Sequence, residues 1–313
     1  MRKLLFILIL ITAFINTTVF ASEIEDDYLD IAGNYCVVGE YDSAMEYLDK
    51  ILKINPSNQK AINLKKGLTH VISQDKKSFV DSVSPSIRTA MEYKRAGNER
   101  EELKYLLKGT QEQNAYLAYY FLGNFYRSKN DYKNALDSYN ASSSARADFA
   151  PAYLTTAIVL YDIGEFSSAI NPIDKYLTFN PEDDLAYAVK SRIEFAMGML
   201  EESKADNERA LELNKCPDYL FDKAKILYKE GKYKQAKDLF KSLLNDIQTS
   251  KIYEYMGLCD YALGDYPNAL TDFDRAILLS VKDEYLENKY NEIKNILENK
   301  QDETNETTQI QQN

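Results

Sequence analysis

The chain has 313 residues, of which 45% are hydrophobic and 28% are charged, and its formal net charge at pH 7 is −11. This acidic balance argues against binding to nucleic acid or anionic lipid, because phosphate contacts need patches of lysine and arginine. A single histidine excludes any site that requires two histidines from one chain.

Residues 1–21 have the pattern of a secretory signal peptide, with Arg2 and Lys3 before the apolar run 4–15 and with Val19 and Ala21 before the expected cut. We expect cleavage after Ala21 and export, most consistently to a bacterial periplasm or cell exterior. A retained membrane anchor is the alternative, although the run is shorter than the ~20 apolar residues of a span. The mature chain is expected not to span a membrane.

Three cysteines, widely spaced, do not form the dense pattern of a small disulfide-built secreted domain. They are interpreted as buried small apolar residues.

A glycine-x-aromatic turn returns along the chain. Its copies are Gly39-Glu40-Tyr41, Gly164-Glu165-Phe166, Gly231-Lys232-Tyr233 and Gly264-Asp265-Tyr266, with looser copies at Asn130-Asp131-Tyr132 and Gly198-Met199-Leu200. From Asn130 onward the step is 33 or 34 residues. A fixed period of this length predicts a stack of helix–turn–helix units.

The first helix expected before each turn has a small residue seven positions ahead of the turn residue: Ala32, Ala90, Gly123, Ala157, Ser191, Ala224 and Gly257. Four positions earlier stands a large one: Tyr28, Tyr119, Tyr153, Tyr187, Leu220 and Tyr253, with Ser86 as the exception. Residues four apart share a helix face, so each pair makes a large-small packing stripe.

The second helix expected after each turn shows a matching pattern. Five positions after the turn come Ala44, Ala135, Ala169, Ser203, Ala236 and Ala269, with Glu102 as the exception. Nine positions after it come Leu48, Leu106, Tyr139, Ile173, Phe240 and Phe273, with Asn207 as the exception.

These columns resemble the tetratricopeptide repeat (TPR), most fully in Tyr119, Leu122, Gly123 and Tyr126 followed by Ala135 and Tyr139. The resemblance covers about residues 25–283. It implies an all-α, right-handed superhelical solenoid of antiparallel helix pairs, with about seven to eight repeats including one truncated unit. It also implies a protein-binding scaffold whose first helices line a concave groove for peptides, without chemistry of its own.

The solenoid is expected over residues 22–300, with an irregular joint near 73–100. The step from Gly39 to Gly97 is too short for two full repeats, and Pro85 is interpreted as the end of a short second helix. The joint is either a hinge or a rigid bend. Residues 283–300 are expected to form a capping helix, and 301–313 a disordered polar tail.

No catalytic constellation, metal motif or cofactor loop stands out, so we expect a non-enzymatic protein without a cofactor or a metal site. His70 is interpreted as a surface or packing residue. The acidic runs 23–27 and 182–184 are interpreted as helix starts rather than calcium ligands.

Beside the packing stripe, the first helices carry aromatic and basic residues expected to face the groove. They are Tyr120, Asn124, Arg127, Tyr161, Arg192, Phe195, Phe221, Lys225, Tyr228 and Tyr261. One interpretation is a site for a protein or peptide segment with apolar anchors and some negative charge. The other is that abundant tyrosine shields the flanks of the helices. Tyr120 stands where the family's carboxylate clamp has a lysine, so that specificity is not transferred. A cell-envelope accessory or carrier subunit that holds a glycan or lipid precursor is the alternative function.

Overall fold

The structure is a computed structural model. It describes residues 28–29, 31–33, 35–36, 41–56, 58, 60–62, 64–65, 68–69, 83–244, 248–280 and 282–312, with side chains as far as residue 299. All secondary structure in these ranges is helical, and consecutive helices pack as pairs, which confirms the expected all-α fold class. The expected signal peptide, and residues 73–82 of the expected joint, lie outside the described residues.

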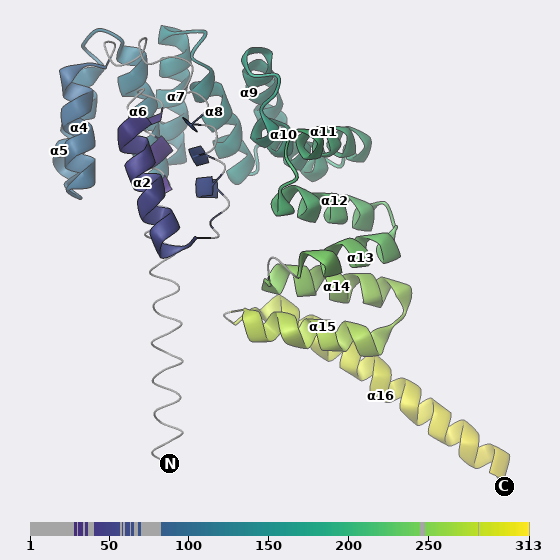
Figure 1. The fold of residues 1–313 in the computed structure, drawn as a ribbon. Coiled ribbons are helices and arrows are strands. Elements are labelled where there is room, and N and C mark those ends of the chain that lie inside the picture. The colour runs from purple at the N-terminus through teal and green to yellow at the C-terminus, as the bar shows by residue number, and fades with distance from the viewer. Residues whose placement is uncertain are drawn as a thin grey trace, which may run out of the picture. The chain divides into compact units, whose positions relative to one another are not determined.

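The chain divides into two compact units, Met1–Ala152 and Tyr153–Asn313 (Figure 1). The first unit contains α2 (Tyr41–Ile54), α4 (Pro85–Arg95), α5 (Glu99–Gly109), α6 (Ala115–Ser128) and α7 (Tyr132–Ala145). In this unit α4 packs on α5, α5 on α6, and α6 on α7. The boundary between the units falls inside α8 (Ala150–Asp162).

After α8, the described part of the second unit contains the second helix of the α8 pair, three further helix pairs and a last helix. They are α9 (Phe166–Phe179), α10 (Asp184–Ala196), α11 (Leu200–Leu213), α12 (Pro217–Lys229), α13 (Tyr233–Leu243), α14 (Ser250–Leu263), α15 (Tyr266–Leu279) and α16 (Glu284–Gln312). Each of these helices packs on the next one in the chain. The first helices of successive pairs also meet, α10 with α12 and α12 with α14, whereas no two second helices in the described part of this unit contact one another to the same extent.

The turns have the backbone geometry that their residues favour. Gly264 ends α14 with φ 78°, in the left-handed region that glycine enters without steric cost. Asn130 takes the same region with φ 57°, as asparagine tolerates. After each of these turns an aspartate caps the next helix, because Asp131 accepts a hydrogen bond from the amide of Asn134 and Asp265 from that of Asn268.

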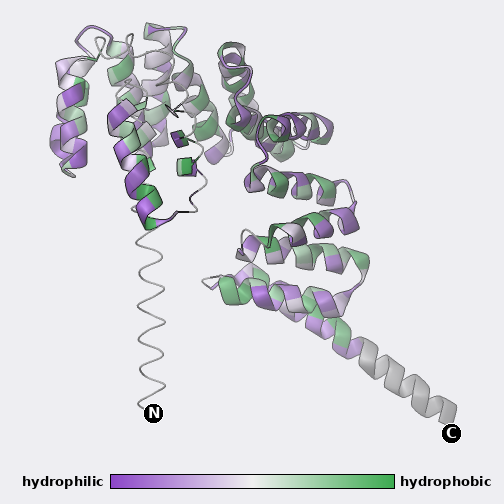
Figure 2. Ribbon diagram, viewed as in Figure 1, coloured by the Kyte–Doolittle hydropathy of each residue, from purple (hydrophilic) through white to green (hydrophobic). Residues whose placement is uncertain are grey.

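The packing columns form the core. All seven small residues of the first-helix column are buried, and so are the seven residues at each of the two second-helix columns, including the exceptions Glu102 and Asn207. Gly123 shows why the first-helix column is small: a methyl group there would lie 2.4 Å from the ring of Tyr139. Because only part of the surface of each helix enters this core, the helices contain both hydrophobic and hydrophilic residues, as Figure 2 shows for α12 to α15.

Two local expectations differ from the structure. Pro85 begins α4 instead of ending a helix, with Ser84 accepting a hydrogen bond from the amide of Ile87; the first turn of a helix tolerates proline because its amide would have no partner there. Helix α16 continues to Gln312, through the segment expected to be a disordered tail. Residues 301–312 contain neither glycine nor proline, so nothing in them breaks a helix.

Residues 83–100 of the expected joint are occupied by α4, a turn at Gly97 and the start of α5. In the described part of the chain, none of the helices has both the length and the apolar character that crossing a membrane requires.

Candidate binding surface on the first helices

The ten predicted groove residues are divided between the two units. Tyr120, Asn124 and Arg127 lie on α6 of the first unit. The other seven lie in the second unit, Tyr161 on α8, Arg192 and Phe195 on α10, Phe221, Lys225 and Tyr228 on α12, and Tyr261 on α14. We use "first-helix face" for the side of the second unit formed by these seven residues.

On α6 the three residues have different environments. Tyr120 is buried, and its ring contacts Tyr139 and Phe149 with centroids 5.9 and 5.3 Å away. Asn124 accepts a hydrogen bond of 2.7 Å from the hydroxyl of Tyr139. Arg127 is half-buried, and its guanidinium makes no ion pair or hydrogen bond with the described residues. Tyr120 is therefore a core residue, whereas Arg127 offers an uncommitted guanidinium to a ligand.

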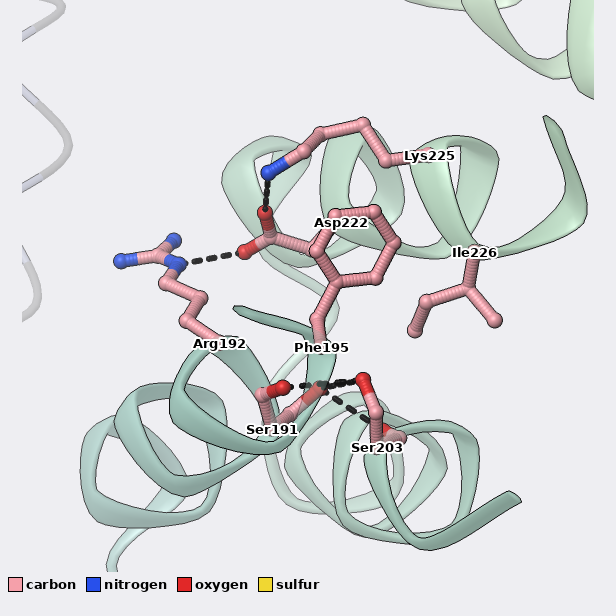
Figure 3. A pocket seen from close by; sticks show the side chains of 7 residues that line it. All are labelled: Ser191, Arg192, Phe195, Ser203, Asp222, Lys225 and Ile226. Carbon is pink, nitrogen blue, oxygen red and sulfur yellow. Dashed lines mark hydrogen bonds and ion pairs between the residues drawn. The ribbon is translucent and has the colours of Figure 1, made fainter. Parts of the chain in front are cut away.

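On the second unit a compact ionic cluster joins α10 to α12 (Figure 3). Arg192 Nε donates to Asp222 Oδ2 at 2.5 Å, and Lys225 Nζ lies 3.3 Å from Asp222 Oδ1. The Lys225 ammonium also lies 5.0 Å from the centroid of the Phe195 ring, within the range of a cation–π contact. Two of the predicted basic residues are thus already paired with a buried carboxylate of the same chain.

A small hollow lies beside this cluster. It is lined by Ser191, Arg192, Phe195, Ser203, Asp222, Lys225 and Ile226. Ser191 and Ser203 each donate to the backbone carbonyl of the other, at 2.7 and 2.8 Å, so their hydroxyl hydrogens are committed to the helix pair α10–α11. Of the lining residues, Arg192, Phe195 and Lys225 are partly exposed, whereas the other four are buried.

Three predicted face residues pack against the turn of their own repeat. The ring centroids lie 5.7 Å apart for Tyr161 and Phe166, 5.4 Å for Tyr228 and Tyr233, and 5.7 Å for Tyr261 and Tyr266. In each pair the second ring is the aromatic residue of the glycine-x-aromatic turn. These contacts have the edge-to-face or tilted geometry that aromatic pairs prefer. The tyrosines therefore support the turns and remain half-buried at the surface.

An aromatic row connects α12 to α14. Tyr255 lies 5.7 Å from Phe221 and 5.9 Å from Tyr228, measured between ring centroids. Burial raises the pKa of Tyr255 to about 12. Further along, the Tyr261 hydroxyl on α14 donates to Glu292 Oε1 on α16 at 2.9 Å, and Lys289 pairs with the same glutamate at 2.8 Å. Side-chain contacts therefore link each first helix from α10 to α16 to the next.

Sequence reasoning missed Asp222, Tyr255 and Glu292. Asp222 stands nine positions before its turn glycine, where the other repeats from Asn130 onward have Phe121, Thr155, Val189 and Tyr255, and the two earlier repeats have Asp30 and Arg88. Among the regularly spaced repeats it is the one charged residue of this column, which is the signal that would have found it. Its 30-residue distance from Arg192 is close to one repeat, which is the spacing of neighbouring first helices.

Comparison with known proteins agrees with the fold. A sequence profile described as tetratricopeptide repeat matches residues 38–58 and 116–149, and a second profile with the same description matches residues 218–246. A TPR repeat-containing protein of Methanocaldococcus jannaschii is 23% identical over 263 residues, which make up 80% of this chain and 45% of that protein. The chain thus spans less than half the length of this relative.

Two solved structures are similar at low sequence identity. PilF of Pseudomonas aeruginosa has a TM-score of 0.55 at 18% identity, over 67% of this chain and 95% of that one. A tetratricopeptide repeat protein from Parabacteroides merdae has a TM-score of 0.51 at 16% identity, over 87% of this chain and 99% of that one. Together with the profile matches, these similarities show that the chain contains tetratricopeptide repeats in a helical solenoid fold.

Proposed function

We propose that the chain is an exported, non-enzymatic scaffold that binds a segment of a partner protein along the first-helix face. The fold itself supports a protein-interaction scaffold. Export rests on the signal-like sequence of residues 1–21.

One observation carries the binding proposal: ring contacts run without interruption across three successive first helices. Phe195 on α10 meets Lys225 on α12, Lys225 lies over Phe221, and Phe221 meets Tyr255 on α14. Phe195, Phe221 and Tyr255 are only half-buried. Half-buried aromatic rings at this density are the usual anchors of protein interfaces.

The chemistry of this face defines the partner. Large apolar side chains would stack on Phe221, Tyr228 and Tyr255, where the Tyr255 ring contacts each of the other two with centroids less than 6 Å apart. Arg192 and Lys225 together carry one more positive charge than Asp222 neutralises. The face therefore suits a segment with several apolar anchors and a modest negative charge.

Site-specific photocrosslinking tests this proposal in the producing cell. A photoreactive phenylalanine analogue replaces Tyr228 on the first-helix face, and the matched control places it at Leu278, which is 76% exposed on the second helix α15. We expect a discrete adduct at position 228 that protease digests, and none at position 278. Equal adducts at both positions, or no adduct at 228, would contradict binding at this face.

The same adduct distinguishes the classes of partner. A protease-resistant adduct that glycosidase or lipase removes would show that the chain is a glycan or lipid carrier instead of a protein-binding scaffold. For a protein adduct, mass spectrometry identifies the crosslinked segment, and a synthetic peptide of that sequence should lose affinity for a Phe221→Ala/Tyr255→Ala double variant.

A further inference from the structure

Two of the repeats contain a pair of buried or half-buried carboxyl groups at equivalent positions. One member stands four residues before the turn glycine and the other eight residues after it, which gives Glu194 with Asp206 and Asp260 with Asp272. The same positions in the repeats around Gly164 and Gly231 hold Leu160 with Pro172 and Leu227 with Leu239. Glu194 is 3% exposed, Asp260 1% and Asp272 9%, whereas the Asp206 side chain is half-buried at 18% exposed, so three of the four acids occupy buried sites that are apolar in the other two repeats.

The first pair lies where α10 packs between α9 and α11, and one lysine there lies within ion-pair distance of three carboxylates. Lys190 Nζ lies 3.0 Å from Asp174 on α9, 3.4 Å from Asp206 on α11 and 3.9 Å from Glu194 on its own helix. Glu202 on α11 adds further negative charge nearby. Glu194 Oε2 is buried without a hydrogen-bond partner among the described residues.

The second pair lies where α14 packs between α13 and α15. Lys237 on α13 lies 2.5 Å from Asp260 Oδ1, and Asp260 Oδ2 is buried without a hydrogen-bond partner among the described residues. Asp272 on α15 is close enough for the charge of Asp260 to act on it. The other charged groups near this pair are Lys241 on α13, with Asp265 and Arg275 at α15.

When two carboxyl groups and one lysine are removed from water, ionisation of all three is unfavourable, because burial and like charge both favour the protonated acid. Burial raises the pKa of Glu194 to about 8, and the negative charge of Asp206 adds to this shift. Burial and the charge of Asp260 likewise raise the pKa of Asp272 to about 6. Each pair therefore carries less negative charge in the folded chain than two free carboxyl groups would at the same pH.

We propose that the two carboxyl pairs form a pH-sensitive device that tightens α10 against α9 and α11, and α14 against α13 and α15, when the pairs are protonated. A folded-state pKa above the unfolded value means that the folded chain binds more protons. The stability contributed by Glu194 is then present below pH 4.5 and is lost as the pH rises through about 8; for Asp272 the window runs from 3.8 to about 6.

The device acts on helices that also form the first-helix face. α10 carries Glu194 toward α9 and α11, and Arg192 and Phe195 toward α12. α14 carries Asp260 toward α13 and Tyr255 toward α12. The inference stands without a binding partner, because its observable is the stability of the repeats themselves.

Thermal unfolding of the full chain, followed by circular dichroism at pH 5.5 and pH 9, tests the proposal. We expect the melting temperature of the wild type to fall by a few degrees at the higher pH, because Glu194 releases its proton from the folded chain in this interval while the unfolded chain releases almost none. Glu194→Gln and Asp272→Asn should each reduce this fall, and the double variant should nearly remove it. Glu201→Gln, on the exposed side of α11, is the matched control and should behave like the wild type.

A double variant that loses as much stability at pH 9 as the wild type would overturn the proposal. Carbon-13 NMR of the side-chain carboxyls in the wild type provides an independent measurement that does not depend on variants folding. Titration midpoints above pH 7 for Glu194 and above pH 5 for Asp272 support the device, and ordinary midpoints near 4 for both exclude it.

Discussion

Gly257 lies directly against the ring of Phe273, so that a methyl group at Gly257 would stand 2.8 Å from the Cδ2 and Cε2 atoms of that ring. Gly123 has the same relation to Tyr139 in another repeat. The small residue of the first helix and the large residue of the second helix are therefore direct partners across the pair.

This contact predicts that Gly257→Leu destabilises the chain by ~1–3 kcal/mol or more, because a filled core cannot accept the added volume without displacing Phe273. Urea denaturation measures the effect. Gly33→Ala is the control, since no heavy atom lies within 4 Å of the methyl group that it adds. A Gly257→Leu chain that unfolds like the wild type would show that the pair adapts at no cost.

The Arg192–Asp222 pair makes a second prediction. Arg192→Ala leaves Asp222, which is 6% exposed, with Lys225 as its one ion-pair partner among the described residues, and should cost ~1–3 kcal/mol. A double-mutant cycle with Asp222→Asn should show coupling, because the asparagine no longer needs a cation. Arg127→Ala, which removes no ion pair among the described residues, should be nearly neutral. Additive costs for Arg192 and Asp222 would mean that the pair contributes nothing.

The cysteines should resist alkylation while the chain is folded. Burial raises the pKa of Cys36 to about 11 and of Cys259 to about 12, and only the thiolate is nucleophilic. At pH 8 we expect iodoacetamide to label both at least ~10-fold more slowly than it does in urea. Peptide mapping over time measures the two rates, and equal rates in the presence and absence of urea would contradict the burial of these thiols.

Residues 1–21 make a prediction about processing. We expect the protein isolated from the producing cell to begin at Ser22 and to occur outside the cytoplasm, because the apolar run 4–15 suits a signal peptidase substrate. Amino-terminal sequencing and cell fractionation test this. An intact amino terminus in the membrane fraction would favour the anchor instead.

The packing of the repeats could be predicted from the sequence because it depends on side-chain size at fixed intervals. The residues that the columns single out, such as Ala157 and Phe240, are buried in the structure. A column position is buried even where its residue type departs from the pattern. Asn207 replaces a large apolar residue, yet it is buried and donates to the backbone oxygen of Tyr219 at 3.0 Å. A position can thus be predicted even when the interaction that occupies it cannot.

The surface contacts were less predictable because periodicity does not indicate which charged or aromatic side chains of neighbouring repeats contact one another. Arg192 could be placed on the first-helix face, but its partner Asp222 comes from another repeat and belongs to none of the columns. The role of Tyr161, Tyr228 and Tyr261 as supports for their turns likewise depends on ring contacts that only coordinates show. Pro85 was misassigned because proline favours both the residue after a helix and the first turn of one.

The carboxylate of Asp222 also bears on how fast a ligand can arrive. Asp222 neutralises one of the two cations beside it, and the overall charge is −11, so this face projects only a small positive field into solution. Encounter with an acidic ligand would therefore lack strong attractive steering, and added salt would speed it by screening the overall negative charge. Differences in affinity between ligands would then lie mainly in the lifetime of the complex, because dissociation rates vary more than association rates among related complexes.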